Sequence, residues 1–476
     1  MEEKIGRIIK RFFWVPLALG VIGYCIVGNS PLWRGLYESG ALYFVNPVSS
    51  VENIWVTLAK LSAMLVATGV VLGFIGSVYR AMDRFWCQHF ADSTAVYTDT
   101  EDGRKFLSTI RHGFPGRMRE HGGPEKAKHQ ILFLEEDTEN LELYDRWKDS
   151  FGDSQVYLLL KETDPFQLGV IDRPNVHFIN IYEVMARRYW RKNHLYEVRE
   201  NPEYAISIVG YGPVGRAIFR YGYLNNLYSL GQKITYHIWG ASPSETEFLK
   251  ALPTENGDRI VLHEKEWRAD LDTIARADRV ILTLEGDALE LAQEILYRNG
   301  GVQIHYYSAS GSRWGDYLAS DKTLCFGARS EYLTEEDIKT ERLFRIGKLF
   351  NYDYALRYAG ADPEHFEEGE MEREWISLNG FKKSSSIARG DHYWIEKKNR
   401  EAGLETEDEL WRLEHFRWSR YHYINHWTYA PERDNAARKH PYLVPYDDLE
   451  QSIKELDGFY SRRIQKEIEG LIEENL

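Results

Sequence analysis

The chain has 476 residues, of which 43% are hydrophobic and 28% charged, and its formal net charge is -14. This length exceeds what one ordinary hydrophobic core supports, so we expect three or more structural units. The acidic balance argues against a nucleic-acid-binding surface, which needs a basic stripe to neutralise phosphates. Cys25, Cys87 and Cys325 are far apart, which is typical of a reducing compartment and excludes a disulfide scaffold or a cysteine-rich zinc site.

Two apolar segments near the N-terminus predict a membrane region in residues 1–85. Residues 12–27 (FFWVPLALGVIGYCIV) carry no charge, although this run is just short of the roughly 20 residues that span a bilayer. Residues 61–79 form a second uncharged run, which would act as a stop-transfer helix even if the first run were a signal peptide. We therefore expect a membrane α-helical hairpin with two transmembrane helices.

The basic residues set the expected orientation of this hairpin. They flank both apolar runs on their outer sides, whereas Arg34 alone is basic in the loop between the runs. By the positive-inside rule both ends lie in the cytosol, so we expect a multi-pass protein of the bacterial inner membrane with a cytoplasmic body. The loop lacks the TVGYG filter of potassium channels, and potassium selectivity is therefore not supported.

A lysine beside the second apolar run and small residues within it are relevant to whether the protein forms a pore. Lys60, just before it, either snorkels to the lipid headgroups or faces a water-filled path. Small residues, among them Gly69, Gly73 and Gly76, favour close helix packing and suggest a homo-oligomer.

From Thr94 onward, short β-rich runs alternate with helical patterns, which is typical of parallel sheets covered by helices on both faces. The predicted strands cover residues 94–98, 130–136, 155–160 and 176–181, then 205–210, 233–240, 259–264, 279–285, 302–308 and 323–328. We interpret residues 90–195 and 200–330 as tandem Rossmann-like domains and residues 331–384 as a helical linker or oligomerisation element. The turn after the first strand reads TDTEDG, and its acids would repel a pyrophosphate. The charged end of the chain, residues 464–476, predicts a helix that frays.

A G-x-G-x-x-G motif stands where the strand of the second domain gives way to a helix. In such a turn the first glycine permits the tight bend, the second admits a pyrophosphate, and the third allows close packing of helix on strand. The predicted nucleotide-binding residues are Gly210, Tyr211, Gly212, Pro213, Gly215, Arg216 and Ser242. The acid expected at the end of the next strand, for the ribose, is missing. NAD(H) or another nucleotide therefore stays open as ligand, and the alternative is a turn whose glycines serve packing alone.

Two apolar helices followed by tandem Rossmann units, one with GYGPVG intact, resemble the RCK/KTN (TrkA-N-type) regulatory domains of potassium channels and transporters. The resemblance covers roughly residues 90–330. It implies Rossmann lobes that assemble into rings or pairs and convert ligand binding into movement of a pore. The missing filter and the missing ribose acid depart from that pattern.

The C-terminal part, residues 385–476, resembles the RyR domain, a small all-α module. The matching sequences are ELWRLEHFRW at residues 409–418 and NHWTYAPERDNAARKHPYLVPYDDL at residues 425–449. The family's Gly-Trp-x-Tyr-Gly turn appears as HWTYA at residues 426–430, with both glycines replaced. The resemblance implies a nucleotide-sensing unit, and some bacterial chains of this kind belong to antiviral signalling systems.

Aromatic and basic residues are dense in this C-terminal part, and such residues stack bases and pair with phosphates. The predicted pocket residues are Glu414, His415, Trp418, Trp427, Tyr429, Arg433, Lys439, His440 and Tyr446. The alternative is that the aromatic residues form the core of a small domain and the arginines its solvated rim.

The leading hypothesis is a nucleotide-gated membrane effector or channel-like protein, whose partners are the lipid bilayer, a nucleotide and further copies of itself. A regulatory subunit of a separate transporter is the first alternative. A membrane-anchored NAD(P)-dependent oxidoreductase is the second, although HExxH spacing, a GxSxG elbow and a convincing pair of acids are missing from the sequence. The sequence therefore does not predict an enzyme.

Overall fold

A computed structural model of the chain describes residues 12–44, 50–90, 92–118, 122–163, 173, 175–254, 256–284, 286–318, 320–339 and 341–473. The chain forms two compact units, Met1–Ser93 and Thr94–Leu476. The finer division into five parts stays a prediction.

The N-terminal unit is helical. Its elements are α2 (Val15–Val21), which continues into a π-helical turn (Ile22–Val27), then α3 (Leu32–Ala41) and α4 (Ile54–Phe90). Small residues allow close packing, because a Cβ added at Gly20 would lie 2.5 Å from the Ser39 Oγ and one at Gly23 would lie 2.7 Å from Val56. Tyr24 is fully buried in the resulting core.

One helix among the described residues, Ile54–Trp86, is long and apolar enough to cross a membrane, with a mean hydropathy of 2.1. The apolar helix Val15–Val27 is shorter. At about 1.5 Å per residue, α4 is longer than the hydrocarbon core of a bilayer, which is about 30 Å thick. Lys60 lies near the start of α4 and is partly exposed. Composition and length thus support the second predicted span more strongly than the first.

The second unit contains two parallel sheets, and the ten strands predicted from the sequence are all present. The first sheet has the order β2-β1-β3-β4-β5. Its strands are β1 (Thr94–Tyr97), β2 (Gly113–Pro115), β3 (His129–Leu132), β4 (Gln155–Leu160) and β5 (Val176–Asn180), and its helices are α5 (Glu101–Leu107), α6 (Asp137–Trp147) and α7 (Ile181–Lys192). β2 was not predicted, because three residues including a proline carry no strand periodicity.

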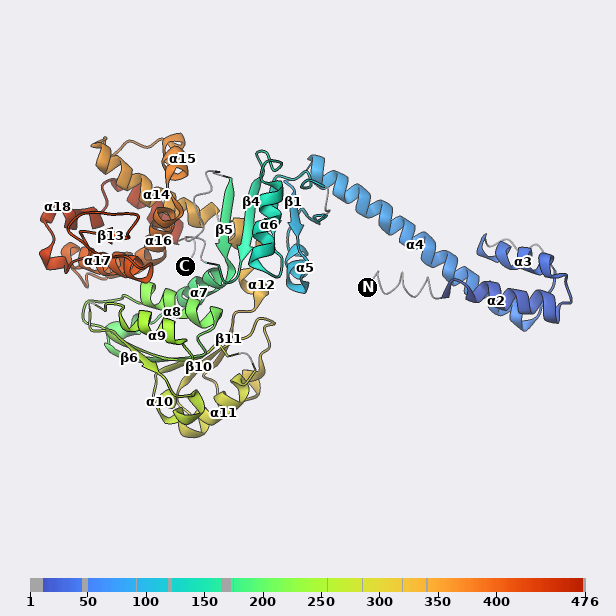
Figure 1. Ribbon diagram of the computed structural model, residues 1–476, viewed down its shortest axis with the longest axis horizontal. Helices are drawn as coiled ribbons and strands as arrows, with labels where there is room; N and C mark the ends of the chain where they lie inside the picture. The colour runs from blue at the N-terminus through green and yellow to red at the C-terminus, as the bar shows by residue number, and fades with distance from the viewer. Residues whose placement is uncertain are drawn as a thin grey trace. The chain divides into compact units, whose positions relative to one another are not determined.

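The second sheet has the order β11-β10-β9-β6-β7-β8. Counted from β6, this is the strand order 3-2-1-4-5-6 of a Rossmann fold. The strands are β6 (Glu203–Val209), β7 (Lys233–Trp239), β8 (Arg259–His263), β9 (Arg279–Leu282), β10 (Gln303–Tyr307) and β11 (Thr323–Phe326). The helices α8 (Pro213–Asn225) and α9 (Pro243–Lys250) lie on one side of this sheet, and α10 (Leu271–Ala275) and α11 (Ala288–Arg298) lie on the other (Figure 1).

Successive side chains of β6 point to opposite faces of the sheet, and helices cover both faces. Ile206 and Ile208 are buried in the core cluster that includes residues of α8, whereas Val209 belongs to the cluster formed with α10 and α11. A strand that is buried on both faces is expected in a parallel sheet covered on both sides. The prediction of Rossmann-like parallel sheets is confirmed.

The remaining chain is helical, as predicted. The elements are α12 (Arg329–Tyr332), α13 (Glu335–Lys339), α14 (Glu341–Ala359), α15 (Glu368–Ser377), α16 (Gly380–Glu401), α17 (Glu407–Ile424), α18 (Gln451–Lys454) and α19 (Arg462–Glu473), with two short strands, β12 (Thr428–Tyr429) and β13 (Lys439–His440). The prediction that the C-terminal helix frays was wrong over the described residues, because Ile464, Ile468 and Ile472 of α19 are buried. These apolar residues recur at helical spacing and hold α19 against the core.

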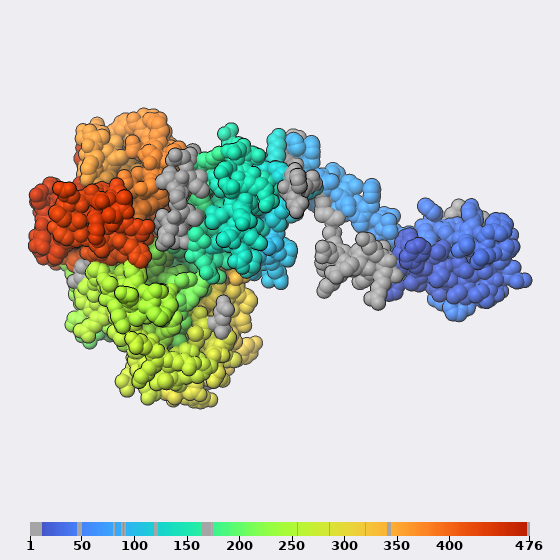
Figure 2. Space-filling view, in the orientation of Figure 1, coloured from blue at the N-terminus to red at the C-terminus, as the bar shows by residue number. Residues whose placement is uncertain are grey.

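The C-terminal helices, orange to red, abut the domain of the second sheet, green to yellow (Figure 2). Buried polar contacts hold α16 there. The His392 Nε2 lies 2.8 Å from the backbone oxygen of Leu227, and the Asn399 side chain donates to the backbone oxygen of Tyr228 at 3.0 Å.

Candidate functional site

The glycine turn joins β6 to α8. Gly210 has φ of +99° and donates its N–H to the backbone oxygen of Trp239 at 3.1 Å. A Cβ added at Gly215 would lie 2.0 Å from the backbone oxygen of Gly210, so the third glycine permits close packing of helix on strand. A Cβ added at Gly212 would meet no atom within 4 Å, so the second glycine borders open space.

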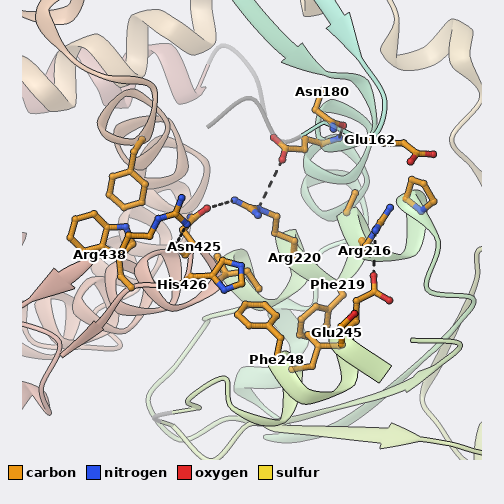
Figure 3. Close-up of a pocket in the computed structure, with 18 of the residues that line it drawn as sticks. Glu162, Asn180, Arg216, Phe219, Arg220, Glu245, Phe248, Asn425, His426 and Arg438 are labelled. Carbon is orange, nitrogen blue, oxygen red and sulfur yellow. Dashed lines mark hydrogen bonds and ion pairs between the residues drawn. The ribbon is translucent and has the colours of Figure 1, made fainter. Parts of the chain in front are cut away.

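The first turn of α8 borders a cavity of about 530 Å³, a volume within the range of small-molecule sites. Three parts of the second unit meet around it: the carboxyl ends of β4 and β5, the helices α8 and α9, and the C-terminal helical region (Figure 3). The lining residues used below are Lys161, Glu162, Asn180, Glu183, Tyr211, Pro213, Arg216, Phe219, Arg220, Ser244, Glu245, Phe248, Phe381, Lys382, Asn425, His426, Trp427, Arg433 and Arg438.

The first sheet contributes one wall of the cavity. In this wall, the side chains of Asn180 and Asp137 form hydrogen bonds with backbone groups. The Asn180 Oδ1 caps α7 by accepting from the backbone N–H groups of Tyr182 and Glu183 at 3.0 and 3.1 Å. The same side chain donates to the backbone oxygen of Lys161 at 3.1 Å. Asp137 accepts three backbone N–H groups of the loop after β4, at 2.8 to 2.9 Å. These bonds order the ends of both strands.

On the second-sheet wall, Arg216 and Glu245 face one another, with the Arg216 Nη1 3.3 Å from the Glu245 Oε1. Glu245 also forms a capping box with Ser242, whose Oγ accepts from the Glu245 N–H at 3.4 Å. Ser242 thus caps the N-terminus of α9, while Ser244 and Glu245 line the cavity. Glu245, in the first turn of α9, places a carboxylate beside the cavity.

The C-terminal wall consists of a turn after α17 together with Phe381 and Lys382 of α16. The Arg220 Nη2 donates to the Asn425 Oδ1 at 2.8 Å, and the Arg438 Nη1 donates to the backbone oxygen of Asn425 at 2.9 Å. The His426 ring lies over Phe248 of α9, with 4.3 Å between ring centroids (Figure 3). Arginines from two parts of the unit therefore position this turn.

The cavity lining combines charge and rings. Its basic residues are Lys161, Arg216, Arg220, Lys382, Arg433 and Arg438, and its acidic residues are Glu162, Glu183 and Glu245. Rings come from Tyr211, Phe219, Phe248, Phe381, His426 and Trp427. Burial raises the pKa of Tyr211, so its hydroxyl stays protonated. An excess of guanidinium and ammonium groups among aromatic faces suits a planar anionic ligand.

A second cavity of about 540 Å³ lies within the C-terminal helical region. Five of the predicted pocket residues line it: Glu414, His415, Trp418, Arg433 and His440. Phe381, Lys382 and Arg433 line both cavities, so the two cavities share a wall.

Buried ionic and neutral groups define this second cavity. The carboxylate of Glu414 accepts two bonds of 2.7 Å from Arg417. Burial acts to raise the pKa of Glu414, but the charges of Arg417 and Arg389 hold it below its usual value. Burial lowers the pKa of His440 to about 4, so this ring is neutral near pH 7.

The remaining predicted pocket residues lie elsewhere. Trp427 is 6% exposed, stacks on Phe381 at 5.1 Å and lines the first cavity. Tyr429 is exposed, and the Lys439 Nζ donates to the Thr428 Oγ1 at 2.5 Å. Tyr446 is buried and donates to Asp408 at 2.9 Å. The predicted pocket residues therefore line two cavities or lie outside both, and their role in binding a ligand stays a prediction.

Several lining residues were not predicted, among them Lys161, Arg220, Phe248, Lys382, His426 and Arg438. Arg220 carried a usable signal, since it follows Arg216 by one helical turn and therefore shares its face of α8. His426 and Arg438 adjoin the predicted Trp427 and Lys439 in the sequence. Lys161, Phe248 and Lys382 come from other segments, and no local pattern marks them.

Comparison with known proteins identifies one segment. Residues 404–471 match the family model of the RyR domain, which confirms that predicted resemblance over those residues. No curated protein matches the chain.

Solved structures with similarity include one described as "GsuK Channel", at 12% identity and a TM-score of 0.35, covering 71% of this chain and 97% of that chain. A second is the GsuK bound to ADP, at 13% identity and a TM-score of 0.32, covering 68% and 96%. A third is D-lactate dehydrogenase from Escherichia coli, at 14% identity and a TM-score of 0.22, covering 57% and 98%. With TM-scores below 0.5, these similarities carry no argument about ligand or activity.

Proposed function

We propose that the protein is a nucleotide-gated membrane effector. A nucleotide binds the cavity beside the glycine turn, and the change it causes in the body drives the membrane helices. The body lies in the cytoplasm, and the apolar helices lie in the bacterial inner membrane. The observation that carries this proposal is the composition of the cavity: three parts of the second unit each contribute basic or aromatic side chains to one space.

A ligand in this position would contact the glycine turn, the strand ends of the first sheet and the turn after α17 at once. Ligand binding shifts a conformational equilibrium only by its difference in affinity for the two states. A site assembled from several parts supplies such a difference, because any rearrangement of those parts alters the site. Phosphate oxygens at Gly212 and Arg216 and a base among the rings would satisfy both kinds of lining group.

The connection to the membrane region is short in sequence. α4 ends at Phe90 and β1 begins at Thr94. Three residues therefore separate the membrane helix from the first strand in the sequence. The described part of one chain has one apolar helix of spanning length and a shorter one, too few to enclose a water-filled path. A conducting state would therefore need several copies, and we include a homo-oligomer in the proposal.

The test is reconstitution of the full chain alone in liposomes loaded with a fluorescent dye. Addition of mono-, di- and cyclic nucleotides is expected to release dye for at least one of them, and Gly212→Asp is expected to abolish that release. Dye release without any nucleotide dependence would contradict gating. Nucleotide binding without release would favour a regulatory role beside a separate transporter, and turnover of NADH would favour an oxidoreductase.

A further inference from the structure

One residue that borders the first cavity holds an unusual backbone conformation. His426 has φ of +64°, in the left-handed region. Its N–H donates to the backbone oxygen of Tyr423 at 2.9 Å, and the next N–H, of Trp427, donates to His422 at 2.9 Å. These two bonds form a Schellman motif at the end of α17, and glycine is the usual residue at this position because it has no Cβ to strain.

A side chain at this position needs a reason, because strain of this kind persists where function uses it. The imidazole of His426 is exposed to the cavity and lies over Phe248, with 4.3 Å between ring centroids and 35° between ring planes. Glycine would relieve the backbone and lose this ring. The two rings belong to different parts of the unit, since His426 follows α17 and Phe248 lies on α9.

The glycine turn with its arginines and the ring pair of His426 and Phe248 border the same cavity. Gly212 is the N-cap residue of α8, and Arg216 and Arg220, one turn apart on that helix, line the cavity. Figure 3 shows His426 beside Phe248, with Arg220 directed toward Asn425. A molecule with a charged part and a planar part can contact both features, whereas phosphate alone cannot.

We propose that His426 and Phe248 form the base-binding subsite of the cavity, and that the planar ring of a nucleotide stacks there while its phosphates lie at Gly212 and Arg216. This inference rests on the proposed function and adds the residues that distinguish a nucleotide from free polyphosphate. The two rings already contact each other, so a base stacks on the outer face of the pair and packs against the contact between α9 and the turn after α17.

The experiment measures the affinity of the full chain in detergent for mono-, di- and triphosphate nucleotides, cyclic nucleotides and NADH, with inorganic triphosphate as the probe that lacks a base. His426→Asn keeps a residue that tolerates the left-handed conformation but removes the aromatic ring. We expect it to weaken binding of at least one nucleotide about tenfold, the effect of one lost stacking contact, with triphosphate binding unchanged. His426→Phe restores a ring and is expected to recover most of the nucleotide affinity.

The possible results separate the two proposals. If the unchanged protein binds neither nucleotide nor triphosphate, the proposed function fails. If His426→Asn binds nucleotide as well as the unchanged protein does, or loses nucleotide and triphosphate binding equally, the base-binding subsite fails. The base-binding subsite also fails if His426→Phe has the melting temperature of the unchanged protein but does not recover nucleotide affinity.

Discussion

Arg420 of α17 and Asp258, in the loop before β8, form an ion pair in which both side chains are buried, with the Arg420 Nη2 2.8 Å from the Asp258 Oδ2. Arg420 also donates to the backbone oxygen of Tyr223 at 2.9 Å, and Asp258 accepts the backbone N–H of Ile234 at 2.7 Å. These contacts hold the C-terminal region against the domain of the second sheet. Because both charged groups are buried, neither can replace a lost partner with water.

Removing one partner of this pair leaves the other charge buried and uncompensated. Arg420→Ala is therefore expected to destabilise the second unit by about 3–5 kcal/mol, measured as a lowered melting temperature or denaturant midpoint. Arg412→Ala is the matched control, because Arg412 pairs with Asp447 at the exposed surface of the same helix. That change should cost no more than about 1 kcal/mol. Equal losses in the two variants would contradict the structural importance of the buried pair.

Two glycines of the same turn, Gly215 and Gly212, allow effects on folding and on nucleotide binding to be tested separately. Gly215→Ala should destabilise the domain, because its Cβ would overlap the backbone oxygen of Gly210 at 2.0 Å. Gly212→Asp should fold, because a Cβ there meets open space, and should lose nucleotide affinity through its bulk and negative charge. Melting temperature and nucleotide titration on each variant test this. Unchanged affinity in a folded Gly212→Asp variant would mean that the glycines serve packing alone.

Titration of His440 should make the folded chain less stable as the pH falls below neutral. Its pKa is about 4 in the folded chain, because of burial, and about 6.5 when unfolded. The unfolded state therefore binds the proton first, and stability is complete above about pH 6.5 and falls as the pH drops toward 4. The Nδ1 accepts the N–H of Tyr442 at 3.2 Å, and protonation removes that acceptor.

His440→Gln is expected to reduce the loss of stability between pH 7 and pH 5 by about 2 kcal/mol. Melting curves of both proteins at the two pH values provide the measurement. An identical pH dependence in the variant would show that His440 does not titrate as described.

Trp427 combines a core position with a place in the cavity wall. Trp427→Ala should cost about 3–5 kcal/mol, as for other large aromatic residues removed from a core, because the side chain is 6% exposed and stacks on Phe381. Trp427→Phe keeps an aromatic ring and should retain most of the stability, so nucleotide affinity is better compared in this variant. A melting temperature unchanged by Trp427→Ala would contradict the packing role.

Local sequence patterns predicted every strand of the two larger sheets except β2. Buried parallel strands are short apolar runs, so all ten predicted strands occur at or near their predicted bounds, as with Gln155–Leu160. The glycine turn was equally visible, since the steric demands on Gly210 and Gly215 leave few other residues acceptable. The RyR resemblance was carried by an ordered set of rare residues, and the family match covers residues 404–471.

Only the tertiary structure decided which residues share a cavity. Lys161, Phe248 and Arg438 come together through the packing of three parts of the chain, and no periodicity in one segment records a neighbour in another. The same packing divides the aromatic and basic residues of the C-terminal region between two cavities, and it places His426 in a left-handed turn against Phe248. The local sequence determines the backbone preference of each segment and the spacing of its buried residues. A site depends instead on how distant segments pack together, which no local pattern records.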